Sequence, residues 1–246
     1  MRARNDQPWC GQVGSLIGED GVVTQSKADA AYDELERLIT FRHLPPGEIV
    51  TEAQLGDRVG VGRTPVREAL QRLAREGMVQ LLPRKGVVIP PVSVEQQLKL
   101  IEVRRPLEEL AVRLAATRRT PDQQSEMAEL SGALAAFDTS LGAEAFGDLL
   151  AQSHHLMARA VDNEHLTVAI GPSQSLSRRF WFATMRDVGA ELRRGADHHS
   201  DVLAAIADGD EEAAAEASGE LLDYLTEFSV ASIAPHRPAR KRAGAG

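Results

Sequence analysis

One stretch of this chain, residues 52–89, carries helix, turn and hairpin signals in close succession. Thr51 is an N-cap candidate for a short helix, and residues 60–62 supply the turn that follows it. A further helix is predicted to begin near Thr64 and Pro65, since proline in the first helical position loses no hydrogen bond. That helix is expected to end near Gly77, after which residues 78–82 and 87–90 form two strands around a turn at residues 83–86. Few folds accommodate this order of elements.

The second helix of this stretch presents long hydrogen-bond donors on one face. Arg63 and Arg67 are four residues apart and share a face, whereas the apolar positions 66, 70 and 73 share another. A guanidinium group can bond both major-groove acceptors of guanine, and the Thr64 hydroxyl and the helix N-terminal amides can hold phosphate. Lys85 and Gly86 at the hairpin tip suit phosphate or minor-groove contact. The pattern predicts a winged helix-turn-helix that binds DNA, with simple solvation of the helix as the alternative.

Charge is distributed unevenly along the chain. The net charge is −8, yet residues 58–85 hold seven basic and two acidic side chains. Residues 93–234 hold twelve basic and twenty-four acidic side chains. A basic patch on an acidic body predicts DNA contact at one end of the molecule only.

The rest of the chain reads as helical. With aromatic residues at 4%, the core must be mostly aliphatic. A first helix is expected from Ser26 to about Thr40. Apolar residues at helical spacing predict further helices over 93–118, 122–138, 142–161, 163–188, 190–208 and 210–233. Glycines and prolines such as Gly171 and Pro172 are expected to interrupt these helices. We therefore predict a mostly α fold, with an N-terminal winged helix-turn-helix carrying a small β-wing and a C-terminal all-helical bundle.

These patterns divide the chain into four parts. We expect a flexible tail over 1–25, the DNA-binding domain over 26–91, an all-helical domain over 92–234, and a disordered basic tail over 235–246. The sequence has no apolar run of the roughly 20 residues that a membrane crossing needs. It also shows no signal peptide, and its single cysteine, Cys10, fits a reducing compartment. A cytoplasmic protein without membrane partners is expected.

A family resemblance supports this interpretation. The run TEAQLGDRVGVGRTPVREALQRLAREGMVQLLPRKGVVI, with its lead-in LPPGEIVTEAQLG, resembles the DNA-binding domain of GntR-family bacterial transcription regulators. The helical remainder resembles the FCD effector domain of the FadR-type branch, through EVRRPLEELAVRLAA, HHLMARAVDNEHL and HHSDVLAAIADGDEEAAAEA. The resemblance implies a ligand-responsive regulator, favouring a repressor, that binds an inverted-repeat operator as a homodimer. It also implies that the helical domain over 92–234 is an effector-binding and dimerisation domain that takes a small-molecule effector.

The resemblance also assigns candidate DNA contacts. Glu52 and Ala53 fall at the start of a helix where the family often has a phosphate-binding arginine, and Ala53 cannot make that contact. The candidate DNA-contacting residues are Glu52, Arg63, Thr64, Arg67, Lys85 and Gly86.

Many FCD domains hold a divalent metal with one aspartate and three histidines. His154 and His199 match two of these positions here, but Leu150 and Leu221 stand at the other two and cannot ligate. Adjacent helical residues point in different directions, so one histidine at most of each pair, 154–155 and 198–199, can face a common pocket. The set is incomplete, so no metal is predicted and the two histidines remain weak candidates. Shifted ligands would have to come from Asp148, Gln152 or Glu220.

Arg104 joins His154 and His199 as the third candidate effector-binding residue. In the family an arginine at this position meets acidic ligands, and a buried guanidinium binds a carboxylate through two hydrogen bonds. The alternative for Arg104 is a pair with Glu108, four residues on. Arg178 or Arg179 are further pocket candidates. The effector is expected to be an organic acid or, given the two leucines, an acyl compound.

Two other function classes compete with a regulator. A metal-dependent enzyme would use His154 and His199, but the sequence offers no nucleophile–base pair at readable spacing. An architectural DNA-binding protein would need no effector, and the long helical remainder argues against it.

Overall fold

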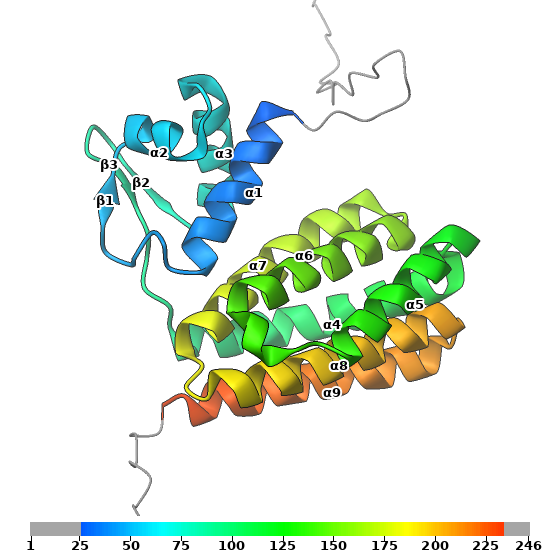
Figure 1. The fold of residues 1–246 in the computed structure, drawn as a ribbon. Helices are drawn as coiled ribbons and strands as arrows, with labels where there is room; N and C mark the ends of the chain where they lie inside the picture. The colour runs from blue at the N-terminus through cyan, green and yellow to red at the C-terminus, as the bar shows by residue number, and fades with distance from the viewer. Residues whose placement is uncertain (1–25, 234–246) are drawn as a thin grey trace, which may run out of the picture.

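The computed structural model describes residues 26–233, in two units that each enclose a hydrophobic core (Figure 1). The winged-helix unit, residues 26–91, lies against one side of the helical bundle, residues 92–233. The tails expected at 1–25 and 235–246, and Cys10, lie outside the described residues.

The winged-helix unit begins with well-capped helices. Its elements are α1 (Lys27–Thr40), β1 (Ile49–Val50), α2 (Glu52–Val59), α3 (Arg63–Arg75), β2 (Gln80–Leu82) and β3 (Gly86–Val88). The Ser26 side chain accepts the first-turn amide of α1, and Thr51 forms a capping box with Gln54 at the start of α2. Gly60, in the left-handed conformation, ends α2. The strands form an antiparallel sheet in the order β1-β3-β2, which is the wing.

Two boundaries differ from the sequence prediction. Helix α3 begins at Arg63 with Gly62 as its N-cap, so Pro65 is the third helical residue rather than the first. The first four amides of a helix have no intrahelical partner, so proline still loses no hydrogen bond there. The strands are shorter than expected, because Met78 and Val79 enter the core instead of the wing.

The helical bundle is built from long helices. They are α4 (Val94–Arg118), α5 (Pro121–Ala135), a short 3-10 turn η1 (Thr139–Leu141), α6 (Gly142–Val161), α7 (Glu164–Thr184), α8 (Val188–Asp208) and α9 (Glu211–Ala231). Helix α4 contacts α6, α7, α8 and α9, so its residues reach the centre of the bundle. None of the helices within residues 26–233 has both the length and the apolar character needed to cross a membrane.

The interruption expected at Gly171 and Pro172 is wrong, because α7 continues through both residues. A helical proline frees the carbonyl four residues earlier, which here belongs to Val168. Val168 is 74% exposed, so its carbonyl lies on the side where water can replace the lost donor. Pro106 in α4 likewise frees the carbonyl of the residue four positions earlier, Glu102, which is also exposed to water.

The two units meet where α1 packs against α7. Phe41, at the end of α1, lies against Phe182 of α7 with ring centroids 4.9 Å apart. The Phe41 ring also fills the space over Gly147 of α6, where a Cβ would collide with it. The Arg179 guanidinium donates to the carbonyl of Pro90 in the connecting segment. The winged-helix unit is therefore held in a defined position on the bundle.

Candidate nucleic-acid interface and ligand pocket

Helix α3 has one buried and one exposed face. Arg63, Thr64 and Arg67 are exposed at its first turns. Within residues 26–233, neither arginine forms a hydrogen bond or an ion pair. The Gly62 N-cap has no side chain, so the first amides of α3 are open to an anion from outside. The opposite face holds the buried Val66, Ala69, Leu70 and Leu73.

Other arginines of the basic patch have partners inside the unit. Arg58 donates to the His43 carbonyl at 3.0 Å. Arg72 lies 3.7 Å over the Tyr32 ring and donates to Glu76 at 3.2 Å. The sequence alone could not distinguish these structural arginines from Arg63 and Arg67 on the outer face of α3, because the difference lies in their three-dimensional contacts.

The wing tip contains Arg84, with a positive φ of 60°, and the exposed Lys85. Gly86 has a φ of 118°, and a Cβ there would lie 2.6 Å from the Val50 carbonyl oxygen. The sheet itself therefore requires glycine, independently of the close approach to DNA that the sequence pattern indicated. Arg84 and Lys85 are the two exposed cations at the tip of the turn.

Glu52 is the first residue of α2 and is partly buried. A carboxylate in the first turn interacts favourably with the helix dipole, which gives Glu52 a structural role beside its candidate contact. Ala53, next to it, is exposed and presents only a methyl group.

The structure brings the three candidate effector-binding residues together. Arg104 of α4, His154 of α6 and His199 of α8 line one cavity of about 20 Å³ in the bundle. Such a volume accommodates about one water molecule. Several other residues of this cavity were not predicted from the sequence; they are Gln174, Ser177 and Trp181 of α7, Gly195 of α8, and Tyr224 and Leu225 of α9.

Arg104 is only 2% exposed and Glu108 only 3%. The Arg104 Nε donates to Glu108 Oε2 at 2.8 Å, and Gln174 donates to Glu108 Oε1 at 3.1 Å. Both roles considered for Arg104 therefore occur together, the pair with Glu108 and the place in the cavity wall. Its two terminal nitrogens have no acceptor among residues 26–233. A fixed guanidinium with free donors is suited to binding an anion.

The two cavity histidines have lowered pKa values. Burial, with the nearby Arg178 and Arg104, holds the pKa of His154 well below its ordinary value. Burial lowers the pKa of His199 to about 4. His199 Nδ1 lies 2.7 Å from the Gly195 carbonyl oxygen and His154 Nδ1 lies 3.2 Å from Arg178 Nη1. The neutral His199 thus donates from Nδ1, whereas the neutral His154 accepts there.

This donor set does not fit a divalent metal. Leu150 and Leu221 are buried, and the Nδ1 lone pair of His154 is taken by Arg178. Within residues 26–233, no three His, Cys, Asp or Glu side chains gather as a metal site would require. The shifted ligands considered above, Asp148, Gln152 and Glu220, are exposed and do not line this cavity.

The structure also distinguishes the two neighbouring arginines of α7. Arg178 lines the cavity, whereas Arg179 is turned to the Pro90 carbonyl. Trp181 donates from Nε1 to the Tyr224 hydroxyl at 2.9 Å, which donates to Glu191 at 2.6 Å. Tyr224 follows Leu221 by about one helical turn on α9, and that spacing was the available sequence signal.

Comparisons with known proteins agree with this architecture. Residues 27–89 match the model of bacterial regulatory proteins of the gntR family, and residues 99–224 match the FCD domain model. The Nta operon transcriptional regulator of Aminobacter aminovorans is 34% identical over 173 residues, which cover 69% of this chain and 79% of that protein. An uncharacterised HTH-type transcriptional regulator of Agrobacterium vitis is 32% identical over 125 residues, 51% of this chain and 73% of that protein.

Solved structures show the same fold. The Escherichia coli McbR/YncC structure matches with a TM-score of 0.71 at 22% identity, over 85% of this chain and 99% of that one. A putative GntR regulator from Rhodococcus matches with a TM-score of 0.58 at 21% identity, over 87% of this chain and 100% of that one. The named relatives are transcription regulators, so the enzyme alternative is wrong. The chain belongs to the GntR family of bacterial transcription regulators, with an FCD domain after its winged helix-turn-helix.

Proposed function

We propose that this regulator binds an inverted-repeat operator as a homodimer, acts as a repressor, and changes its operator affinity when a small anionic effector binds. The observation that carries the DNA contact is the pair of exposed guanidinium groups of Arg63 and Arg67 on the outer face of α3, which have no partner among residues 26–233. Thr64, Lys85, Gly86 and Glu52 complete the proposed DNA-contacting set, with the α3 amides and Lys85 on phosphate. Such a regulator works in the cytoplasm, where the chromosome lies.

Fluorescence anisotropy with operator DNA tests this contact. A bidentate contact to guanine contributes about 1–3 kcal/mol, so Arg63→Ala and Arg67→Ala should each weaken specific binding by roughly 5- to 150-fold. Arg159→Ala, which removes a charge on α6 paired with Glu126, is the matched control and should leave binding unchanged. Operator affinity that is the same in the α3 variants and the control would refute the assignment.

A dimer is supported by the outward face of α4. Val103 is 60% exposed and Leu110 is 47% exposed, and their spacing of seven residues places them on one stripe. A two-fold dimer buries the same stripe of both copies against each other. Val103→Glu with Leu110→Glu should then shift the mass in analytical ultracentrifugation from dimer to monomer, and an unchanged mass would exclude this surface.

The effector pocket is proposed around Arg104, His154 and His199. The free donors of Arg104 favour a carboxylate or another anion, in keeping with an organic acid or acyl compound. A thermal-shift screen with such acids should give stabilising compounds with the wild-type protein and lose them with Arg104→Met. The architectural alternative predicts no stabilising compound at all.

A further inference from the structure

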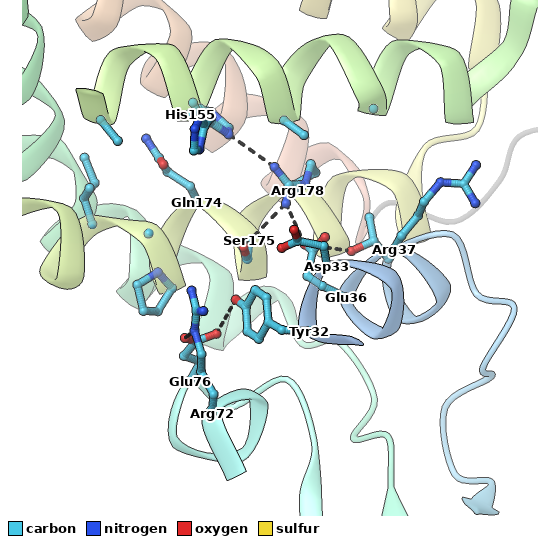
Figure 2. A pocket seen from close by; sticks show the side chains of 18 of the residues that line it. Tyr32, Asp33, Glu36, Arg37, Arg72, Glu76, His155, Gln174, Ser175 and Arg178 are labelled. Atoms are coloured by element: carbon cyan, nitrogen blue, oxygen red, sulfur yellow. Dashed lines mark hydrogen bonds and ion pairs between the residues drawn. The ribbon is translucent and has the colours of Figure 1, made fainter. Parts of the chain in front are cut away.

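The cavity in the bundle is too small for an effector. Its volume is about 20 Å³, whereas ligand sites generally measure roughly 300–1,000 Å³. A second cavity of about 970 Å³ lies between the two units, where α1 and α3 face α6 and α7 (Figure 2). The two cavities share His154, Gln174 and Arg178 in their walls. The small cavity therefore adjoins the larger one, and these three side chains belong to the wall of both.

Arg178 lies between these two cavities and lines both. Its Nη1 contacts His154 Nδ1 at 3.2 Å. Its Nη2 contacts Glu36 Oε1 of α1 at 2.6 Å, a pair that Figure 2 shows. The side chains of Arg178 and Glu36 are only 10% and 12% exposed. The other ion pairs between the units within residues 26–233, which Arg37 and His43 form with α6, are far more exposed. Arg178–Glu36 is thus the well-buried electrostatic link between pocket and α1.

The cleft carries charges of both signs from every element around it. Within the described residues, its acidic groups are Asp33 and Glu36 of α1, Glu76 of α3 and Asp148 of α6, and its basic groups are Arg37 of α1, Arg72 and Arg75 of α3, His154 and His155 of α6, and Arg178 of α7. Glu36 and Glu76 each contact an arginine, at 2.6 Å and 3.2 Å. Arg75 is exposed and forms no ion pair with residues 26–233. Asp148 lies 3.7 Å from Arg37, and Asp33 is not without a partner either. With the open donors of Arg104 in the adjoining small cavity, the groups that lack a partner among residues 26–233 are therefore cationic.

We infer that the effector site extends from the bundle into the cleft between the units, and that it takes an anionic ligand whose carboxylate or phosphate binds Arg178 in competition with Glu36. The inference rests on the proposed ligand response and names its ligand class and its route to the DNA-binding unit. A guanidinium fork matches both anions. The head group meets Arg178 and Arg104, and the remainder of the ligand occupies the cleft against α1 and α3.

Competition at Arg178 links ligand binding to the position of α3. The Arg178 Nη2 atom cannot hold Glu36 and a ligand oxygen in the same place, so ligand binding removes the buried link to α1. Helix α1 packs directly on α3, and the two share one hydrophobic core. Release of α1 from α7 therefore moves the DNA-reading helix relative to the bundle. Linkage requires that removing Glu36 raises ligand affinity, because the competitor is gone.

Calorimetric titration of the full-length protein with octanoate and with octyl phosphate tests this competition, and the pair of probes distinguishes a carboxylate from a phosphate head group. Octan-1-ol is the uncharged control. Glu36→Gln should bind one of the two anions about 5- to 150-fold more tightly than wild type, the usual range of coupling between sites. Glu144→Gln is the matched control, because it removes a different ion pair between the units, with Arg37, and Glu144 does not line the cleft. Its affinity should equal that of wild type.

Arg178→Met should abolish binding, and Arg178→Lys, which keeps the charge but loses the fork, should retain only part of it. Hydrogen exchange of residues 27–40 should rise when the anion is added to wild type and should already be raised in the ligand-free Glu36→Gln protein. The inference is overturned if Glu36→Gln binds neither anion or binds no more tightly than wild type. It is also overturned if Arg178→Lys binds like wild type. Operator binding of the ligand-free wild type is measured separately. It tests the proposed DNA-binding function independently of the result of the anion titration.

Discussion

The buried pair of Arg104 and Glu108 allows a sharp stability prediction. Replacing Arg104 with Met keeps most of the side-chain volume but leaves the Glu108 carboxylate, 3% exposed, with Gln174 as its remaining partner. Breaking a buried pair by removing one partner costs roughly 3–5 kcal/mol. That is a large part of the roughly 5–15 kcal/mol by which a domain is stable. At about 2–4 °C per kcal/mol for a domain of this size, the melting temperature should fall by roughly 6–20 °C.

A second substitution tests whether the unpaired charge is the cause. In the double variant Arg104→Met with Glu108→Gln, the glutamine carbonyl still accepts from Gln174 and no charge is buried. Replacing a buried ion pair by uncharged groups of similar volume is often neutral, so the double variant should recover most of the lost stability. The two substitutions are therefore expected to be strongly non-additive.

Urea unfolding followed by the fluorescence of Trp181, which lines the same cavity, measures these differences. The matched control is Lys99→Met, since Lys99 pairs with Glu95 at the same spacing on the same helix but both side chains are more than two thirds exposed. That variant should lose less than about 1 kcal/mol. The reasoning fails if Arg104→Met costs no more than this control, or if the double variant is as unstable as the single one.

Three further predictions follow from the geometry. The folded-state pKa of His199 is about 4 against an ordinary value of 6.5, so stability is lost as the pH falls below 6.5. The contribution of His199 to the loss at pH 5 is about 2 kcal/mol, and His154, whose pKa is also lowered, adds a loss of its own. Urea unfolding at pH 5 and 7.5 should therefore show a loss in wild type that is smaller by about 2 kcal/mol in His199→Asn. Gly86→Ala, whose Cβ would lie 2.6 Å from a carbonyl oxygen of β1, should destabilise the winged-helix unit in thermal unfolding. Gly132→Ala, in an open helical position, should instead stabilise by about 0.5–1 kcal/mol, so equal effects would contradict the steric argument. Gly147→Ala places a Cβ against the Phe41 ring and should increase proteolysis of the segment between the units, and an unchanged cleavage rate would show that this contact does not hold them together.

The winged-helix unit was largely predictable because its signals are local. Ser26 and Thr51 cap the helices that follow them, and Gly60 supplies the left-handed turn, within a few residues of each boundary. The apolar positions 66, 70 and 73 define the buried face of α3, and they also fix which residues must point outward. Helix α3 starts earlier than predicted, at Arg63, and the strands are shorter than predicted because Met78 and Val79 pack in the core.

The ligand pocket was only partly predictable because its signals are not local. Arg104, His154 and His199 were identified from resemblance, yet the choice between Arg178 and Arg179 depends on how α7 is rotated against α1 and α6. Tyr224 enters the cavity from α9, and its spacing of about one helical turn from Leu221 is the one sequence signal that could have indicated it. The cleft between the units was not predicted at all, since it arises from the docking of α1 on α7.

The proposed competition for Arg178 also allows a test of whether the ligand weakens or strengthens operator binding. In the ligand-free protein the Arg178–Glu36 pair holds α1 against the bundle, and the ligand removes the pair. Glu36→Gln removes the same pair without ligand, so its operator affinity should change in the direction that the ligand itself causes. If operator DNA prefers the docked arrangement, Glu36→Gln binds operator more weakly and the ligand releases the regulator from DNA. If operator DNA prefers the released arrangement, the variant binds more tightly and the ligand promotes binding. One anisotropy measurement on the ligand-free variant, with Glu144→Gln beside it, therefore separates an inducer from a corepressor before the natural effector is known.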